Sequence, residues 1–255
     1  MGNTKDNTNY INAEIYIKEE LINKKIRIIN SFDNFKKENE IKDKETDNIY
    51  TNEKEIKRCQ IKINKKLIDF SYYYKFNQKG KYNIKYSLPS KLKNISYMFS
   101  GCKYLTNIDL SNFNTKNVSN MSHMFYGCFS LANIDLSNFN VENVIDMSYM
   151  FHGCNSLANI DLSNFNTQNV TDMSRMFHGC NLLTNINLSN FNTKNVSNMS
   201  HMFSEYNSLA NIDLSNFNTQ NVTDMSWMFH GCNSLTNIDL SNFNTEKVTD
   251  MSYMF

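Results

Sequence analysis

Residues 157–180 of this chain read LANIDLSNFNTQNVTDMSRMFHGC, and close copies of this segment fill its C-terminal part. The dipeptide Met-Phe marks the register, because it occurs seven times at a constant interval of 26 residues, from Met98-Phe99 to Met254-Phe255. A fixed period of about 20 to 50 residues is typical of stacked repeats, in which each unit buries its apolar side against the next. We therefore expect residues 91–255 to form one stack of about six coils.

Each copy of the repeat combines two apolar patterns. The alternation in Ile108-Asp109-Leu110 predicts a short strand with Ile and Leu inward. Val118, Met121 and Met124 follow at intervals of three, which predicts a helix of about two turns that ends near Gly127. The sequence thus predicts an α/β solenoid of leucine-rich-repeat type, with one short parallel strand and one short helix in each 26-residue coil.

The repeat L-x-x-I-D-L-S-N-F-N-T-x-N-V-x-x-M-S-x-M-F-x-G-C resembles that of the BspA-like leucine-rich-repeat surface proteins. The resemblance covers roughly residues 95–255 and recurs in nearly every coil. It implies an extended binding surface, often displayed on cells, that supports adhesion to host or matrix proteins. It does not imply catalysis, and it says little about the residues before the repeats.

The first 90 residues lack the repeat. Residues 1–9 are expected to be disordered, and residues 10–90 to form a β-rich capping domain over the first coil. Alternating apolar residues on both sides of residues 77–80 predict a hairpin there. At the other end the chain stops in mid-coil at Phe255 without a visible cap, and an exposed last coil would offer a surface for self-association.

Charge differs between the two parts of the chain. Residues 1–95 hold 21 Lys and Arg against 13 Asp and Glu, whereas residues 96–255 hold 5 against 12. Basic and acidic side chains alternate in the first part and no stretch concentrates aromatic residues with Arg, so no nucleic-acid partner is expected. No apolar run is long enough for a membrane-spanning segment. The absence of a signal peptide favours the cytoplasm, the resemblance favours the cell surface, and the localisation stays open between them.

Cysteine usage follows the repeat. Since no Cys-x-x-Cys pair is present, no metal site is expected, and nothing in the sequence calls for a cofactor. A small thiol after the Gly of each coil is expected to pack inward, as a reduced structural ladder suited to a reducing compartment. The ladder consists of Cys102, Cys128, Cys154, Cys180 and Cys232.

No catalytic site is predicted, and we expect the protein not to be an enzyme. The histidines occur only in the repeats, and the Ser and Asp residues near them are copied from coil to coil as scaffold residues are. His152 and His178 are equivalent in adjacent coils, but no Cys or acidic partner stands at a fixed position beside them. A zinc site is therefore not expected.

Two rows of residues are candidate binding surfaces. The variable position of Met-Ser-x-Met holds residue types that are enriched at protein interfaces. This helix-side stripe consists of Tyr97, His123, Tyr149, Arg175, His201, Trp227 and Tyr253. Its alternative interpretation is a set of tolerant, solvent-facing helix positions. The strand-side acidic row, which would attract cations or a basic partner, consists of Asp109, Asp135, Asp161, Asp213 and Asp239, with Asn187 at the sixth position.

These observations together favour a non-enzymatic protein-binding repeat protein for cell-surface recognition or adhesion. The expected partner is a protein, such as a host or matrix protein. The alternative is an intracellular scaffold for protein–protein interaction, which the missing signal peptide and the free cysteines favour.

Overall fold

The computed structural model describes residues 9–42 and 51–255. Before the repeats lie β1 (Asn9–Ile17), the 3-10 helix η1 (Glu19–Leu21), β2 (Lys25–Arg27), α1 (Phe32–Glu38), α3 (Glu53–Ile56), β3 (Gln60–Ile63), β4 (Lys66–Ile68), β5 (Tyr73–Lys75) and β6 (Gly80–Leu88). The repeats contribute β7 (Leu105–Asp109), β8 (Asn133–Ile134) and β9 (Asn159–Ile160). Residues 1–8 of the expected disordered terminus lie outside the described residues, and Asn9 already begins β1.

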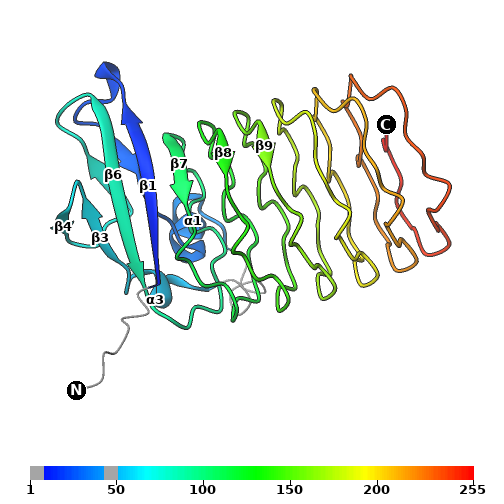
Figure 1. Cartoon of the computed structure of the whole chain (residues 1–255), viewed down its shortest axis with the longest axis horizontal. Helices are drawn as coiled ribbons and strands as arrows, with labels where there is room; N and C mark the ends of the chain where they lie inside the picture. The colour runs from blue at the N-terminus through cyan, green and yellow to red at the C-terminus, as the bar shows by residue number, and fades with distance from the viewer. Residues whose placement is uncertain (1–8, 43–50) are drawn as a thin grey trace.

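The N-terminal strands form an antiparallel sheet in the order β4-β3-β6-β1-β7, beside a two-stranded sheet of β2 and β5. β7 belongs to the first coil, so the N-terminal sheet and the repeats share one sheet (Figure 1). The predicted hairpin around residues 77–80 is wrong, because β5 pairs with β2 whereas β6 pairs with β1 and β3. The tight turn lies instead at Asn64-Lys65, where both φ angles are positive, as a two-residue turn of type I′ requires.

The N-terminal part covers the first coil with aromatic side chains. The buried Tyr86 of β6 packs edge-on against Phe99 of the first coil, with ring centroids 5.4 Å apart. Helix α1 begins at the N-cap Ser31, whose hydroxyl accepts a hydrogen bond from the Asn34 N–H. From this helix, Phe35 lies 4.6 Å from Tyr97, centroid to centroid. The apolar end of the stack is therefore covered on this side.

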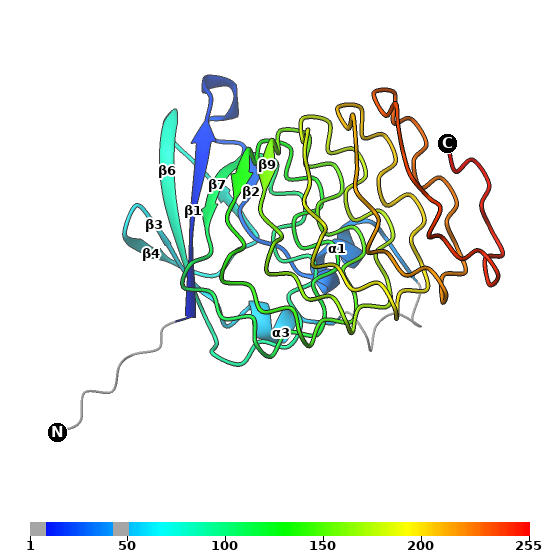
Figure 2. The same ribbon diagram turned by 45° about the vertical axis from the view of Figure 1, so that its right-hand side comes forward.

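The predicted α/β solenoid of leucine-rich-repeat type is wrong. In the described part of the chain, both α-helices precede the repeats, and residues 91–255 contain none (Figure 2). The sheets are mostly antiparallel, and the parallel pair is β8–β9, two residues in each strand. Most of each coil consists of turns, joined to the next coil by isolated parallel bridges such as that between Asn120 and Asp146. The structure is a mostly β protein with a stack of coils.

Tight turns account for the apolar spacing that predicted a helix. The Val118 N–H donates to the Thr115 carbonyl at 2.9 Å, and the Met124 N–H donates to the Met121 carbonyl at 3.2 Å. Within the second turn, the N–H of His123 donates to the carbonyl of Ser148 in the next coil instead. Turns closed over three residues bring every third side chain to the same side, much as a short helix does. The spacing of three residues alone therefore could not distinguish the two structures.

Apolar side chains from equivalent positions pack into columns along the stack. The phenylalanine after each second Met is at most 2% exposed from Phe99 to Phe229, and neighbouring rings stack with centroids 5.7–6.0 Å apart. The column contains Phe99, Phe125, Phe151, Phe177, Phe203 and Phe229. From the second coil on, each of these rings therefore lies between the phenylalanines of the two neighbouring coils, which fixes the register of the stack.

Candidate functional site

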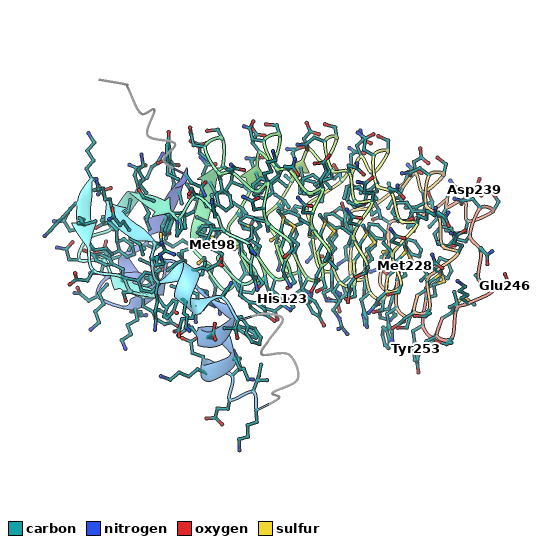
Figure 3. All side chains as sticks on the ribbon, turned by 90° about the horizontal axis from the view of Figure 1, so that it is seen from below. Met98, His123, Met228, Asp239, Glu246 and Tyr253 are labelled. Atoms are coloured by element: carbon teal, nitrogen blue, oxygen red, sulfur yellow. The ribbon has the colours of Figure 1, made fainter. Side chains whose placement is uncertain are left out.

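The predicted helix-side stripe does not lie on a helix. All seven of its residues, from Tyr97 to Tyr253, have left-handed backbone conformations, with φ between 52° and 61°. Residues other than Gly adopt this backbone conformation uncommonly, and a right-handed helix cannot continue through a residue that adopts it. Figure 3 shows His123 and Tyr253 along one edge of the stack and Asp239 along the opposite edge. We call the seven residues the ring column, since all of them except Arg175 carry a ring.

The side chains of the ring column contact one another along the stack. Ring centroids lie 4.3 Å apart for Tyr97–His123 and for His123–Tyr149, 5.5 Å apart for His201–Trp227, and 4.4 Å apart for Trp227–Tyr253, each pair being stacked. Arg175 bridges the space between Tyr149 and His201. Its guanidinium carbon is 5.2 Å from the Tyr149 ring centroid, and its Nη2 lies 3.0 Å from His201 Nε2. The ring faces are thus largely occupied by neighbours within the chain.

A second line of rings runs beside the ring column. His152 stacks on Tyr126 at 4.8 Å and on His178 at 4.4 Å. Burial lowers the pKa of His123 and of His152 to about 3, so both imidazoles are neutral near pH 7. Their Nδ1 atoms are buried without a hydrogen-bond partner among the described residues. In the described part of the chain, no three His, Cys, Asp or Glu side chains are grouped so as to hold a metal ion.

All five side chains of the predicted acidic row are exposed. In each, Oδ1 accepts a hydrogen bond from the backbone N–H of the serine two residues later, at 2.9–3.0 Å. Hydrogen bonding from that serine lowers the pKa of Asp109, Asp161, Asp213 and Asp239 below the ordinary range, so these carboxylates are charged at neutral pH. Asn187 accepts the same bond from Ser189 at 3.0 Å. Each aspartate therefore closes a turn and presents a fixed carboxylate to solvent.

An open groove of about 650 Å³ follows this row over three coils. Asp135, Asp161 and Asn187 line it together with asparagines of the same strand segments, Asn133, Asn159 and Asn185. The groove lies on the strand side, where the first coils carry β8 and β9. Amides and carboxylates alternate along its floor, an arrangement that offers hydrogen-bond donors and acceptors to an extended ligand.

A second hollow, of about 510 Å³, lies on the outer face of the N-terminal sheet. We call it the trough. One wall carries Lys62 of β3, Lys65 of the turn after β3 and Lys85 of β6. The opposite wall carries Asn107 and Asp109 of β7. No motif or repeat in the sequence singles out these lysines. Alternation in β3 and β6 places Lys62 and Lys85 on the outer face, but only the strand order brings them together.

The five cysteines of the predicted ladder are free, as is Cys59. Cys102, Cys128, Cys154 and Cys180 are buried, and burial raises the pKa of the Cys102 and Cys154 thiols to about 12. From Cys128 on, each thiol of the ladder donates to the carbonyl of a phenylalanine in the preceding coil, at 3.0–3.3 Å. Tyr206 replaces the cysteine in one coil and is buried there. These thiols pack the coil interior and are poor nucleophiles.

Comparisons with known proteins place the repeats in a family. The model of the family described as "Mycoplasma protein of unknown function, DUF285" matches residues 68–185 and 157–255, well over half of the chain. Comparison with curated proteins and with solved structures gave no significant match. No described helix is both long enough and apolar enough to cross a membrane.

Proposed function

The chain belongs to the DUF285 family, and from this premise we propose that it is a non-enzymatic protein that binds a basic polypeptide along its acidic row. The observation that carries the proposal is the set of exposed aspartates whose carboxylates are each fixed by a serine N–H. A carboxylate already held in place loses little conformational entropy on binding, so its attraction for a cation is retained.

Charge supports the choice of a basic partner. Residues 96–255 hold 12 acidic against 5 basic side chains, so the repeats carry a net charge of about −7. The electrostatic field of this negative charge accelerates the association of the repeats with a positively charged segment and disfavours the binding of an acidic segment. The groove beside Asp135 and Asp161 gives this attraction a concave surface on which an extended segment fits.

The ring column is the less suitable surface. Its faces stack on one another, so a partner would meet ring edges rather than faces, apart from the exposed Tyr253. Aromatic hot spots at interfaces derive much of their affinity from burying ring surface. Most of that surface is already buried within the chain, and the acidic row is therefore the site that we propose.

The resemblance to BspA-like surface proteins refines the proposal to cell-surface recognition or adhesion, with a host or matrix protein as the partner. The second candidate is an intracellular scaffold, which the six free cysteines favour because thiols persist in reducing compartments. Added protease acting on intact cells distinguishes the two. Cleavage of the protein supports adhesion, and full protection supports the scaffold.

Binding is tested with a peptide of alternating lysine and serine, about 12 residues long, which extends to roughly 40 Å. In the variant D135N/D161N each new amide keeps the acceptor for its serine N–H, as Asn187 does naturally, while both charges are lost. We expect the affinity measured by calorimetry to fall about tenfold, since each exposed charge pair contributes up to about 1 kcal/mol.

The matched control is E142Q/E246Q, which removes two exposed acidic charges of the repeats outside the acidic row. It should change the affinity much less than D135N/D161N does. Equal losses in the two variants would show that the peptide senses net charge alone, and no binding to the native chain would refute the proposal directly.

A further inference from the structure

One row of side chains crosses the outer face of the N-terminal sheet, and its charge changes along the row from basic to acidic. The strand register places Lys62 of β3 opposite Lys85 of β6, Lys85 opposite Asn12 of β1, and Asn12 opposite Asp109 of β7. Cross-strand partners point to the same face, with Cβ atoms about 5 Å apart. Asp109 is the first member of the acidic row, so the row of lysines leads directly into it.

The lysines of the trough have no carboxylate partner among the described residues. Glu14, the acidic side chain of β1 in the trough, pairs with Lys81 at 2.6 Å instead. The ammonium of Lys85 sits 3.6 Å from the Tyr10 ring centroid, which holds it on the sheet face. Lys62 and Lys85 are like charges directly opposite each other, an arrangement that costs stability unless an anion lies between them.

The trough is large enough to admit such an anion. The space between the wall with the lysines and the wall with Asp109 has a volume of about 510 Å³, which is ample for a carboxylate group. A carboxylate placed against the lysine wall would neutralise the repulsion between Lys62 and Lys85. Against that wall it would face Asp109 from the other side of the trough rather than lie beside it, and Glu14, which also lines the trough, is already paired with Lys81.

We infer that the trough receives an acidic side chain of the same polypeptide whose basic residues follow the acidic row. This inference rests on the proposed function and adds the charge order of the partner. An acidic residue lies over Lys62, Lys65 and Lys85, and basic residues follow beyond Asn12, from Asp109 onward along the repeats. A partner with this order matches the surface at both ends, whereas a uniformly basic one matches only the repeats.

Two peptides of about 12 residues, or roughly 40 Å extended, test the inference. Both end in the same lysine–serine half. One begins with alternating glutamate and glycine, and the other has glutamine in place of glutamate. Net charge alone would make the glutamate peptide bind the acidic repeats more weakly. We expect the opposite, a glutamate peptide that binds the native chain about fivefold more tightly, since two or three exposed charge pairs supply about 1 kcal/mol.

The variant K62Q/K85Q should abolish this preference. Its matched control is K25Q/K75Q, because Lys25 and Lys75 also face each other across two strands, β2 and β5, but do not line the trough. The control removes the same number of charges and should keep the preference. Circular dichroism of both variants verifies the native sheet. The melting temperature should change little in either, because each variant loses a like-charge contact, while K62Q/K85Q also loses the stabilising contact of Lys85 with the Tyr10 ring.

The outcomes separate the two proposals. If the native chain does not bind the glutamine peptide, the proposed function fails. If it binds the glutamine peptide but binds the glutamate peptide equally or more weakly, the trough inference alone is overturned. The inference is also overturned if K25Q/K75Q loses the preference as K62Q/K85Q does.

Discussion

Thr167 and Asn192 exchange two hydrogen bonds between neighbouring coils. The Thr167 hydroxyl donates to the Asn192 carbonyl at 3.1 Å and accepts from the Asn192 N–H at 2.9 Å. The same exchange joins Thr115 to Asn140, Thr193 to Asn218 and Thr219 to Asn244. Val141 interrupts the series, and there the Asn166 N–H donates to the Asn164 carbonyl instead. The buried threonines thus serve the contacts between coils.

Exchanging Thr and Val at equivalent positions tests this role. T167V should lower the free energy of unfolding by about 1–2 kcal/mol, because it removes both hydrogen bonds at a buried position. V141T should be neutral or raise it by up to about 1 kcal/mol, because it supplies the missing hydroxyl. Urea denaturation measures both. Equal effects of the two substitutions would contradict the assigned role.

Truncating a ring of the phenylalanine column should be among the most costly changes in the repeats. Phe151 is fully buried and stacks on Phe125 at 5.7 Å and on Phe177 at 5.8 Å. F151A should destabilise the chain by about 3–5 kcal/mol, the usual cost of removing a buried aromatic ring. F129A is the control, because the Phe129 side chain is 43% exposed and its loss should cost much less. A small effect of F151A in urea denaturation would exclude the column as the core of the stack.

The sequence predicted the 26-residue period and the stacking of coils, because both follow from the repeated apolar residues alone. It did not predict the backbone within a coil. Val118, Met121 and Met124 show the same spacing in successive turns as in a helix. The left-handed residues that decide between the two, such as His123 and Tyr149, are not glycines and gave no signal.

Of the two candidate sites, the acidic row could be predicted from the sequence and the trough could not. The exposure of Asp135 and its equivalents was predictable, since they alternate with buried residues such as Ile134 and Leu136. The trough was not, because it depends on a pairing between β1 and β7 that joins residues about a hundred positions apart. Long-range strand order of this kind is not encoded in local periodicity.

The cysteines should be silent toward thiol reagents in the native state. Burial raises the pKa of Cys59 and Cys154 to about 12, and that of the half-buried Cys232 to about 11. Titration with a chromogenic disulfide should therefore detect at most Cys232 in the native chain, and all six thiols in denaturant. Rapid reaction of two or more native thiols would contradict the packed ladder.

Stability should fall as the pH drops below neutrality, because of the buried histidines. The pKa of His123 and of His152 is lowered from 6.5 to about 3 in the folded chain. Below pH 6.5 the unfolded chain therefore takes up protons that the folded chain does not, and the free energy of unfolding decreases down to the folded pKa. The hydrogen-bonded aspartates, whose ordinary pKa is 3.8, lose their contribution only at lower pH.

A single substitution isolates the contribution of one histidine. H152Y copies Tyr126, which occupies the equivalent position one coil earlier and stacks in the same line of rings. Since tyrosine does not titrate between pH 7 and 5, the variant should take up roughly one proton fewer on unfolding, and its stability should fall less steeply. Urea denaturation at pH 7, 6 and 5 measures the slope. A native stability that is constant over this range would show that these histidines are protonated equally in the folded and unfolded chains, and would exclude neutral stacked imidazoles as part of the fold.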